Sequence, residues 1–175
     1  MSMLRWALLT VLVALVVHAI VVLRAPSFIM SKAIERVSRN GAAVNAFTFG
    51  PQVSPASRAI VRPSPDLAYA SCVYDLGDGP VRIRVAPWDD YVSLSLYAGN
   101  TDNFYTINDA AMAGQPVEIV LVTREQTPPS GAKVVVSPTR RGIALERRLA
   151  PNAERFALAD AARRQSVCEP LRQKR

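Results

Sequence analysis

The polar side chains that could do chemistry in this sequence gather in its middle third. Asn100, Asp102 and Asn103 lie in one short run, and Asp109 follows the segment Phe104–Ile107. Carboxylate and amide oxygens can bind a cation or a polar ligand, although Asp and Asn also favour turns because their side chains bond the nearby backbone. The spacing does not match an EF-hand loop. The run therefore predicts either a ligand or cation site, or two loops that flank a strand.

Histidine usage limits the reactions open to the chain. The single histidine, His18, lies in an apolar N-terminal stretch, so the remainder cannot build a Ser-His-Asp or Cys-His catalytic group or a His-ligated metal site. No glycine-rich phosphate loop and no Cys-x-x-Cys pair occur. We expect no cofactor, no metal and no catalytic residues, although acid–base work by two carboxylates stays open. His18 itself predicts contact between membrane helices in preference to proton transfer.

The apolar stretch runs unbroken from Trp6 to Leu23, between Arg5 and Arg24. At about 1.5 Å per residue it reaches about 27 Å, close to the thickness of a hydrocarbon core. The stretch predicts an uncleaved transmembrane anchor over residues 1–25. A cleaved signal peptide is the alternative, but cleavage after Ala19 would leave an exposed apolar N-terminus.

A second helix is predicted directly after the anchor, over residues 26–46. Pro26 can open it, and Met30, Ile34 and Val37 form one apolar stripe beside basic residues. Such a helix suits the headgroup surface of anionic lipid, and packing on its own domain is the alternative.

Alternating apolar and polar residues dominate the rest of the chain, residues 47–175. This period of two predicts half-buried strands, and turn signals separate them at short intervals. We therefore expect an all-β fold, an antiparallel β-sandwich-like domain with a C-terminal helix at Asn152–Val167. The expected strands are Tyr69–Leu76, Val81–Val85, Val92–Tyr97, Phe104–Asn108, Val117–Thr123, Lys133–Ser137 and Gly142–Leu149.

Two observations on the location of this domain disagree. Arg24, Lys32, Arg36 and Arg39 follow the span, and by the positive-inside rule they place the domain in the cytoplasm. The two cysteines, Cys72 in a predicted strand and Cys168 at the end of the predicted helix, can instead form a disulfide in an exported domain. Two unrelated buried thiols are the alternative.

Charge does not identify a partner. The net charge of +7 and the isoelectric point near 10.0 are typical of proteins that bind nucleic acid. The anchor, an acidic middle third and the absence of a nucleic-acid motif argue against it, so we expect no nucleic acid. Anionic lipid or an acidic partner is the simpler use of the charge.

Several pieces together resemble a bacterial family, the domain-of-unknown-function family numbered 1254. They are Val61–Ser71, Tyr74–Leu76 with Gly79-Pro80, Asp90–Tyr97 and Asn103-Phe104. The resemblance implies a β-sandwich-like fold and an exported location, and it implies no catalytic role for any residue. Longer relatives continue into a second β-rich domain, the 1214-type domain, and we expect this sequence to be a short form that stops before it. Leu67-Ala68 replaces the usual threonine before Tyr69, which puts a ligand role of that threonine in doubt.

Two functions remain open at this point. The first is a non-catalytic subunit or scaffold of a cell-envelope complex, anchored by a single span in the bacterial inner membrane with its domain in the periplasm. A separately encoded companion resembling the 1214-type domain, or a second copy of the chain, would cover an apolar face or sheet edge left open. The second is an envelope enzyme or solute-binding module with a cleft lined by Asp, Asn and Tyr. Its candidate residues are Asp66, Tyr69, Asp75, Asn100, Asp102, Asn103 and Asp109.

Overall fold

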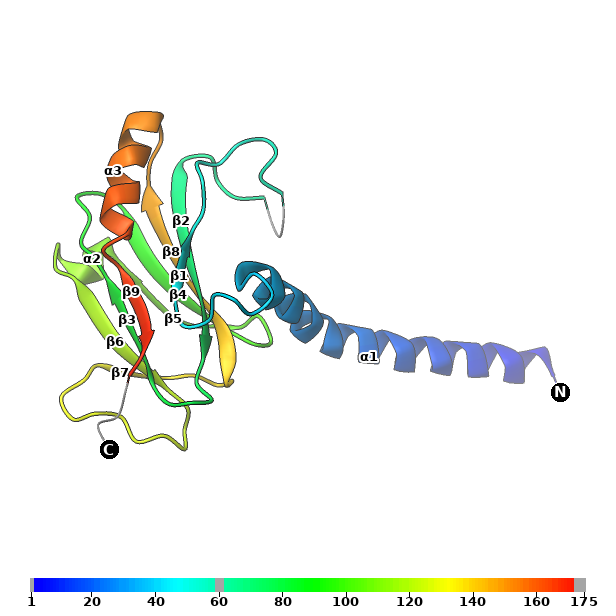
Figure 1. Ribbon diagram of the computed structural model, residues 1–175. Coiled ribbons are helices and arrows are strands. Elements are labelled where there is room, and N and C mark those ends of the chain that lie inside the picture. The colour runs from blue at the N-terminus through cyan, green and yellow to red at the C-terminus, as the bar shows by residue number, and fades with distance from the viewer. Residues whose placement is uncertain (1, 59–61, 172–175) are drawn as a thin grey trace.

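The computed structural model describes residues 2–58 and 62–171 (Figure 1). The described chain forms one long N-terminal helix that projects away from two β-sheets. Val61 of the family-like segment and the basic tail residues Arg172, Lys174 and Arg175 lie outside the described residues.

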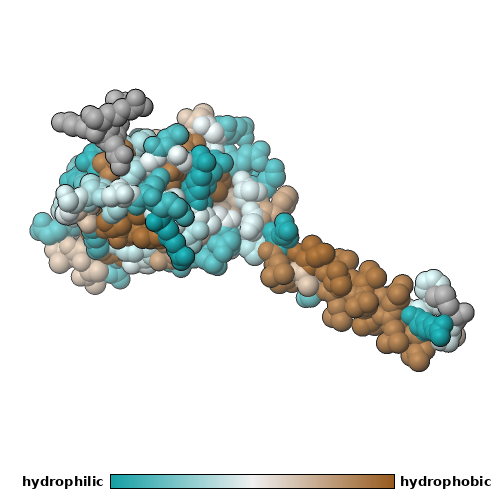
Figure 2. All heavy atoms as spheres, turned by 90° about the horizontal axis from the view of Figure 1, so that it is seen from below, coloured by the Kyte–Doolittle hydropathy of each residue, from teal (hydrophilic) through white to brown (hydrophobic). Residues whose placement is uncertain are grey.

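Helix α1 spans Met3–Val37 without interruption. It is long and apolar enough to cross a membrane, and its most apolar window is not buried against the rest of the chain. Figure 2 shows this apolar surface projecting from the domain, with polar atoms at its far end. An exposed apolar surface of this extent is unusual on a soluble monomer, and both an anchor and a signal sequence have it.

The expected break between anchor and second helix is absent, because Pro26 lies inside α1. Proline cannot donate a backbone hydrogen bond to the carbonyl four residues earlier. The helix nevertheless continues, and its C-terminal part is held by packing: Met30, Ala33 and Ile34 are buried against Val73 and neighbouring residues of the domain. The apolar stripe therefore packs on the domain.

The first sheet contains five antiparallel strands in the order β1-β2-β8-β4-β5. The strands β2 and β8 pair along their whole lengths, from Leu67 opposite Leu149 to Asp75 opposite Arg141. The edges of this sheet are β1 and β5. The bounds are β1 Phe47–Phe49, β2 Leu67–Asp75, β4 Val92–Ala98, β5 Asn103–Asn108 and β8 Arg141–Leu149.

The second sheet contains four strands in the order β7-β6-β3-β9. The pairs β3–β6 and β3–β9 are antiparallel, whereas β6–β7 is parallel. The bounds are β3 Val81–Val85, β6 Val117–Val122, β7 Val134–Val136 and β9 Val167–Pro170.

One apolar core joins the two sheets. The alternation in β3 places Val81, Ile83 and Val85 in this core and leaves Arg82 and Arg84 on the outer face. Buried residues of β2, β4 and β8 from the first sheet belong to the same cluster as those of β3, β6 and β9 from the second. The β-rich fold predicted from the alternation is thus confirmed.

The C-terminal region differs from the prediction. Helix α3 is shorter than expected, Ala153–Arg163, and Cys168 lies in strand β9 and not at a helix end. Strand β9 forms because its residues pair with β3, with Val167 opposite Arg84. Strand β1 and the one-turn helix α2, Asp109–Met112, were also not expected.

The sequence predicted an apolar face or sheet edge left open, and the outer face of the second sheet carries charged side chains. Arg82 forms ion pairs with Glu118 and Glu169 across neighbouring strands of this face. Within residues 2–58 and 62–171, large exposed apolar side chains outside α1 are few and scattered. They are Tyr91, Val134, Val136 and Leu158.

Candidate functional site

The polar run predicted as a binding site forms the turn between β4 and β5. Asn100 Nδ2 donates to Asp102 Oδ2 at 2.6 Å, and Thr106 Oγ1 donates to Asn103 Oδ1 at 3.0 Å. Asp109 is the first residue of α2. Asn100 Oδ1 also accepts from Asp102 N at 3.3 Å, so the Asn100 and Asp102 side chains serve the turn itself, as the turn interpretation of the run predicts.

The remaining candidates lie along β2 and do not meet. Asp75, at the end of β2, accepts from Arg140 Nε at 3.0 Å and from Gly77 N at 2.9 Å. Tyr69 lies six positions earlier, about 20 Å away along an extended strand, and its hydroxyl oxygen accepts from the Ser64 backbone. Asp66 precedes the strand. The β2 candidates Tyr69 and Asp75 are therefore spread along the strand and do not face one common position.

Two other expectations concern metals and His18. In the described part of the chain, no three His, Cys, Asp or Glu side chains are grouped to hold a metal ion. His18 lies in the exposed apolar part of α1.

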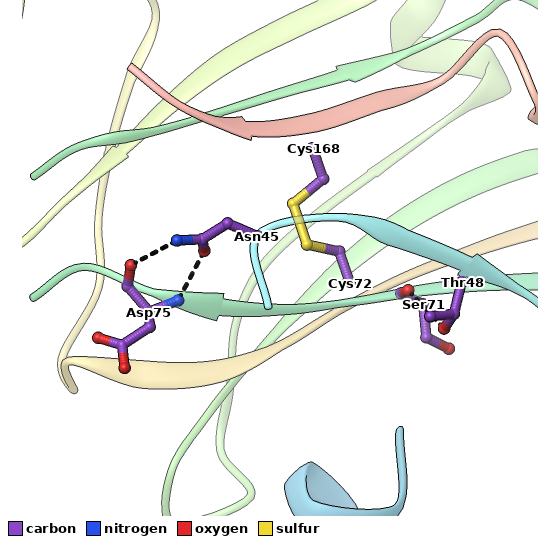
Figure 3. Close-up of a disulfide and its surroundings, with 6 residues drawn as sticks. All are labelled: Asn45, Thr48, Ser71, Cys72, Asp75 and Cys168. Atoms are coloured by element: carbon purple, nitrogen blue, oxygen red, sulfur yellow. Dashed lines mark hydrogen bonds between the residues drawn. A yellow bond between two sulfur atoms is a disulfide. The ribbon is translucent and has the colours of Figure 1, made fainter. Parts of the chain in front are cut away.

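A disulfide joins the two sheets. Figure 3 shows Cys72 of β2 bonded to Cys168 of β9 across the core. The two residues are 96 positions apart, and a loop of that length corresponds to about 4–5 kcal/mol of stabilisation in the chain-entropy account.

Beside the disulfide, Asn45 ties the segment after α1 to β2. Its Oδ1 accepts from Asp75 N at 2.8 Å and its Nδ2 donates to Asp75 O at 2.9 Å (Figure 3). Asn45 has a positive φ of 53°, a conformation that asparagine tolerates better than most residues. The connection from α1 into the domain is therefore fixed by side chain as well as by backbone.

A buried ion pair lies at the end of the core near α3. Arg148 Nε donates to Glu146 Oε1 at 2.6 Å, and both side chains are almost fully buried. The Arg148 guanidinium also donates to the carbonyls of Ala86 and Pro87, at 2.8 and 3.0 Å. Burial raises the pKa of Glu146, and the charge of Arg148 acts in the opposite direction. The Arg148 side chain therefore holds the loop after β3 against strand β8.

A second buried arginine links α3 to the first sheet. Arg163 donates to the carbonyls of Tyr69 and Gly50 and to the carboxylate of Asp160. The guanidinium also lies 5.7 Å from the Phe49 ring centre. This arginine therefore holds β1, β2 and α3 together. The sequence alone did not single out this arginine.

A large hollow lies where α1 meets the domain. It measures about 780 Å³ and is bounded by α1, the outer face of β2, β4 and β8, and the segment after β1. Met30 and Ala33 line it from α1, and Ile143, Leu145 and Arg147 line it from β8. Among the predicted site residues, only Tyr69 lines this cavity.

The family described as "Protein of unknown function (DUF1254)" matches residues 44–170, which is most of the chain. The chain belongs to the DUF1254 family. The match begins just after α1 and ends with β9, so it covers both sheets. No curated protein is similar enough to the chain to give a match.

Solved structures share the fold of this DUF1254 chain. The VPA0106 protein of Vibrio parahaemolyticus matches with a TM-score of 0.58 and 14% identity, over 89% of this chain and 42% of that one. An uncharacterized protein of Burkholderia cenocepacia matches with a TM-score of 0.50 and 16% identity, over 67% of this chain and 35% of that one. This DUF1254 chain therefore spans less than half the length of either structure.

The pieces that resemble the family occupy neighbouring strands of the DUF1254 domain. Asp66-Leu67-Ala68-Tyr69 opens β2, and Gly79-Pro80 forms the turn into β3. Asp90–Tyr97 contains most of β4, and Asn103-Phe104 opens β5. The pattern therefore marks strand starts and turns of the fold.

Proposed function

We propose that this DUF1254 chain is a non-catalytic, membrane-anchored subunit or scaffold of a cell-envelope complex, with a β-sandwich-like domain. The observation that carries the proposal is the continuity of α1. One helix runs from the apolar stretch Trp6–Leu23 into the contact with the domain, with no linker between them. A domain attached in this way is held at a fixed height above the bilayer, which suits a scaffold.

The proposed location is the inner membrane, with the domain in the periplasm. The disulfide between Cys72 and Cys168 supports it, because such bonds persist in oxidising compartments and are rare in the cytosol. The charge count after the span favours the opposite orientation, but a folded domain can be exported despite flanking charge. We give the disulfide more weight because it joins the two sheets.

The placement of the polar candidates supports a non-catalytic role. Asn100, Asp102 and Asn103 serve a turn, and the Asp75 carboxylate is shared by Arg140 and Arg141. Acid–base catalysis needs two carboxyl groups that face one reacting position. The geometry favours binding over an enzymatic cleft.

The proposed partner is a companion β-rich domain of the 1214 type, or a second copy of the chain. Strand β5 is an edge of the first sheet, hydrogen-bonded to β4 on one side only. Edge strands offer backbone donors and acceptors to a partner strand. Both solved structures of this fold are longer than this chain and hold further residues beside the shared fold.

The test is site-specific crosslinking in intact membranes. A photoreactive benzoylphenylalanine replaces Thr106, which is exposed on β5, and the matched control replaces Glu125 in the turn after β6. We expect a covalent product with a companion chain or with a second copy from position 106 and none from position 125. A purified monomer with no crosslinked chain at position 106 would contradict the proposal.

A further inference from the structure

The cavity between α1 and the first sheet has a positively charged lining. Three arginines line it, Arg58, Arg62 and Arg147, and no acidic side chain is among its described lining residues. The Arg58 Nε donates to the Pro55 carbonyl at 3.0 Å. An opening with this lining attracts an anion and repels a cation.

Arg147 lacks one of the partners that its guanidinium needs. Its Nη2 donates to Ser95 Oγ at 2.8 Å, whereas its Nε is buried without a hydrogen-bond partner. A buried donor left unpaired is unfavourable, but Nε has almost no exposed surface and is itself out of reach of a molecule in the cavity. Arg147 lies on the outward face of β8, at the cavity, where its charge attracts an anionic group and its other guanidinium N–H groups can donate to one.

The remaining walls of the cavity are apolar. Met30 and Ala33 of α1 face Ile143 and Leu145 of β8, and Tyr69 extends the same surface. The volume of about 780 Å³ falls within the range of small-molecule sites, roughly 300–1,000 Å³. A ligand for this cavity must therefore combine an anionic group with a hydrocarbon part.

With α1 across a bilayer, as proposed above, the cavity lies near the membrane surface. Met30 follows the end of the apolar stretch at Leu23 by about 10 Å of helix, and the polar layer of a bilayer is of similar depth. Phe28 and Ile29 are exposed between the two and continue the apolar surface of α1 towards the cavity. A molecule of the bilayer can reach the cavity along this surface.

We propose that the cavity binds an anionic phospholipid of the bilayer that α1 crosses. One acyl chain packs against Met30, Ile143 and Leu145, and the phosphate accepts from Arg147. The proposal goes beyond the scaffold function and rests on the anchoring of α1.

The experiment uses the full chain in nanodiscs that contain a phospholipid with a photoreactive acyl chain. Phosphatidylglycerol and phosphatidylcholine carry the same photoreactive chain and a phosphate each, so the two probes differ only in the headgroup, which leaves phosphatidylglycerol with a net negative charge and phosphatidylcholine with none. Labelling is mapped by mass spectrometry. We expect phosphatidylglycerol to label the cavity residues 143–147 about tenfold more than phosphatidylcholine does, because the choline cation neutralises the phosphate of phosphatidylcholine and is repelled by the arginines. Both probes should label the span Trp6–Leu23.

Matched variants assign the effect to the cavity. Arg147→Gln should lower the phosphatidylglycerol labelling about tenfold, whereas Arg84→Gln, the same change on the outer face of the second sheet, should leave it unchanged. Leu145→Trp fills the cavity and should also lower the phosphatidylglycerol labelling. It provides a second measurement if Arg147→Gln unfolds the domain.

Three results would overturn the proposal. Equal labelling of the cavity by both lipids removes the anionic selectivity, and labelling confined to the span removes the site. A protein crosslink from benzoylphenylalanine at Leu145 in intact membranes would replace the lipid with a partner chain. Span labelling by neither probe would contradict the anchor itself, and so separates a failure of the anchor from a failure of this site.

Discussion

Arg148 places its guanidinium group inside the protein, where a charge is unfavourable unless it has partners. The fold compensates with Glu146 and with the carbonyls of Ala86 and Pro87. Removing one partner of a buried pair leaves the other charge uncompensated, whereas replacing both with apolar residues often costs little.

We therefore expect Arg148→Met to lower the free energy of unfolding by about 3–5 kcal/mol. The double variant Glu146→Leu/Arg148→Met should recover most of that loss. Urea unfolding of the full chain in detergent, followed by circular dichroism, measures both. The control is Arg84→Met on the outer face of β3, expected within about 0.5 kcal/mol of wild type. A loss for Arg148→Met no larger than for this control would contradict a structural role of the pair.

Asp160 makes a contribution to the stability of the fold that depends on pH. Burial acts to raise its pKa, but hydrogen bonds from Arg164 and Arg163 prevail and hold the pKa of Asp160 below its ordinary value of 3.8. A lowered carboxyl pKa stabilises the fold above the unfolded value, and this stabilisation is lost as the pH falls through the folded value.

We expect Asp160→Asn to lower the melting temperature at pH 7, by the equivalent of about 1–3 kcal/mol for a charged hydrogen bond. The difference from wild type should shrink below about pH 3.8, where the carboxyl group of the unfolded wild-type chain becomes protonated. Melting curves of both proteins between pH 2.5 and pH 7, about one unit apart, measure it. A difference that stays constant over this range would contradict the ionised role of Asp160.

At the residue scale, the sequence shows which side chains share one face of a strand, but it does not distinguish a turn from a ligand site. The alternation of β8 could have placed Glu146 and Arg148 on the core side with Ala144. The run at Asn100–Asn103 could not have been resolved, because Asp and Asn serve turns and ligands with the same atoms. Only the three-dimensional placement shows that the run closes a turn.

At the scale of elements, the strands were predictable and the boundaries of helices were not. Val81–Val85 was placed correctly because its alternation reports burial directly. Strand β9 was missed because four residues carry no period, and it forms only through pairing with β3. The break at Pro26 was wrong because packing of the following turns outweighs the missing hydrogen bond.

Removal of the disulfide should cause a measurable loss of stability. We expect Cys72→Ser to lower the free energy of unfolding by about 4–5 kcal/mol in the chain-entropy account. The wild-type chain should migrate faster on a non-reducing gel than on a reducing one, and Cys72→Ser should not. Equal mobility of wild type and variant without reductant would contradict the bond.

The contact of α1 with the domain predicts a change in protease sensitivity. Ile34→Asn places an unpaired amide in the buried contact, at a cost of about 1–3 kcal/mol, so the contact should open about tenfold more often. Trypsin should then cut after Arg36 or Arg39 faster by a similar factor. Leu158→Asn, an exposed apolar position on α3, is the control and should not change the rate. An unchanged rate in Ile34→Asn would contradict the rigid connection.

At the scale of the whole molecule, two physical arguments place the domain on opposite sides of the membrane. Basic residues after the span favour a cytoplasmic domain, whereas a disulfide that joins both sheets needs an oxidising compartment. The sequence alone leaves this conflict open. The structure adds that the cysteines meet across the core, which strengthens the second argument.

The most direct test of the central claim is a reporter fused after Arg175 and assayed in washed membranes. A fluorescent protein that matures only in the cytoplasm is compared with alkaline phosphatase, which is active only outside it. An anchored periplasmic domain predicts a dark fluorescent fusion and an active phosphatase, both retained in the membrane fraction at the full-length mass. A bright fluorescent fusion would contradict the orientation, and an active phosphatase released from the membrane at a shorter mass would contradict the anchor.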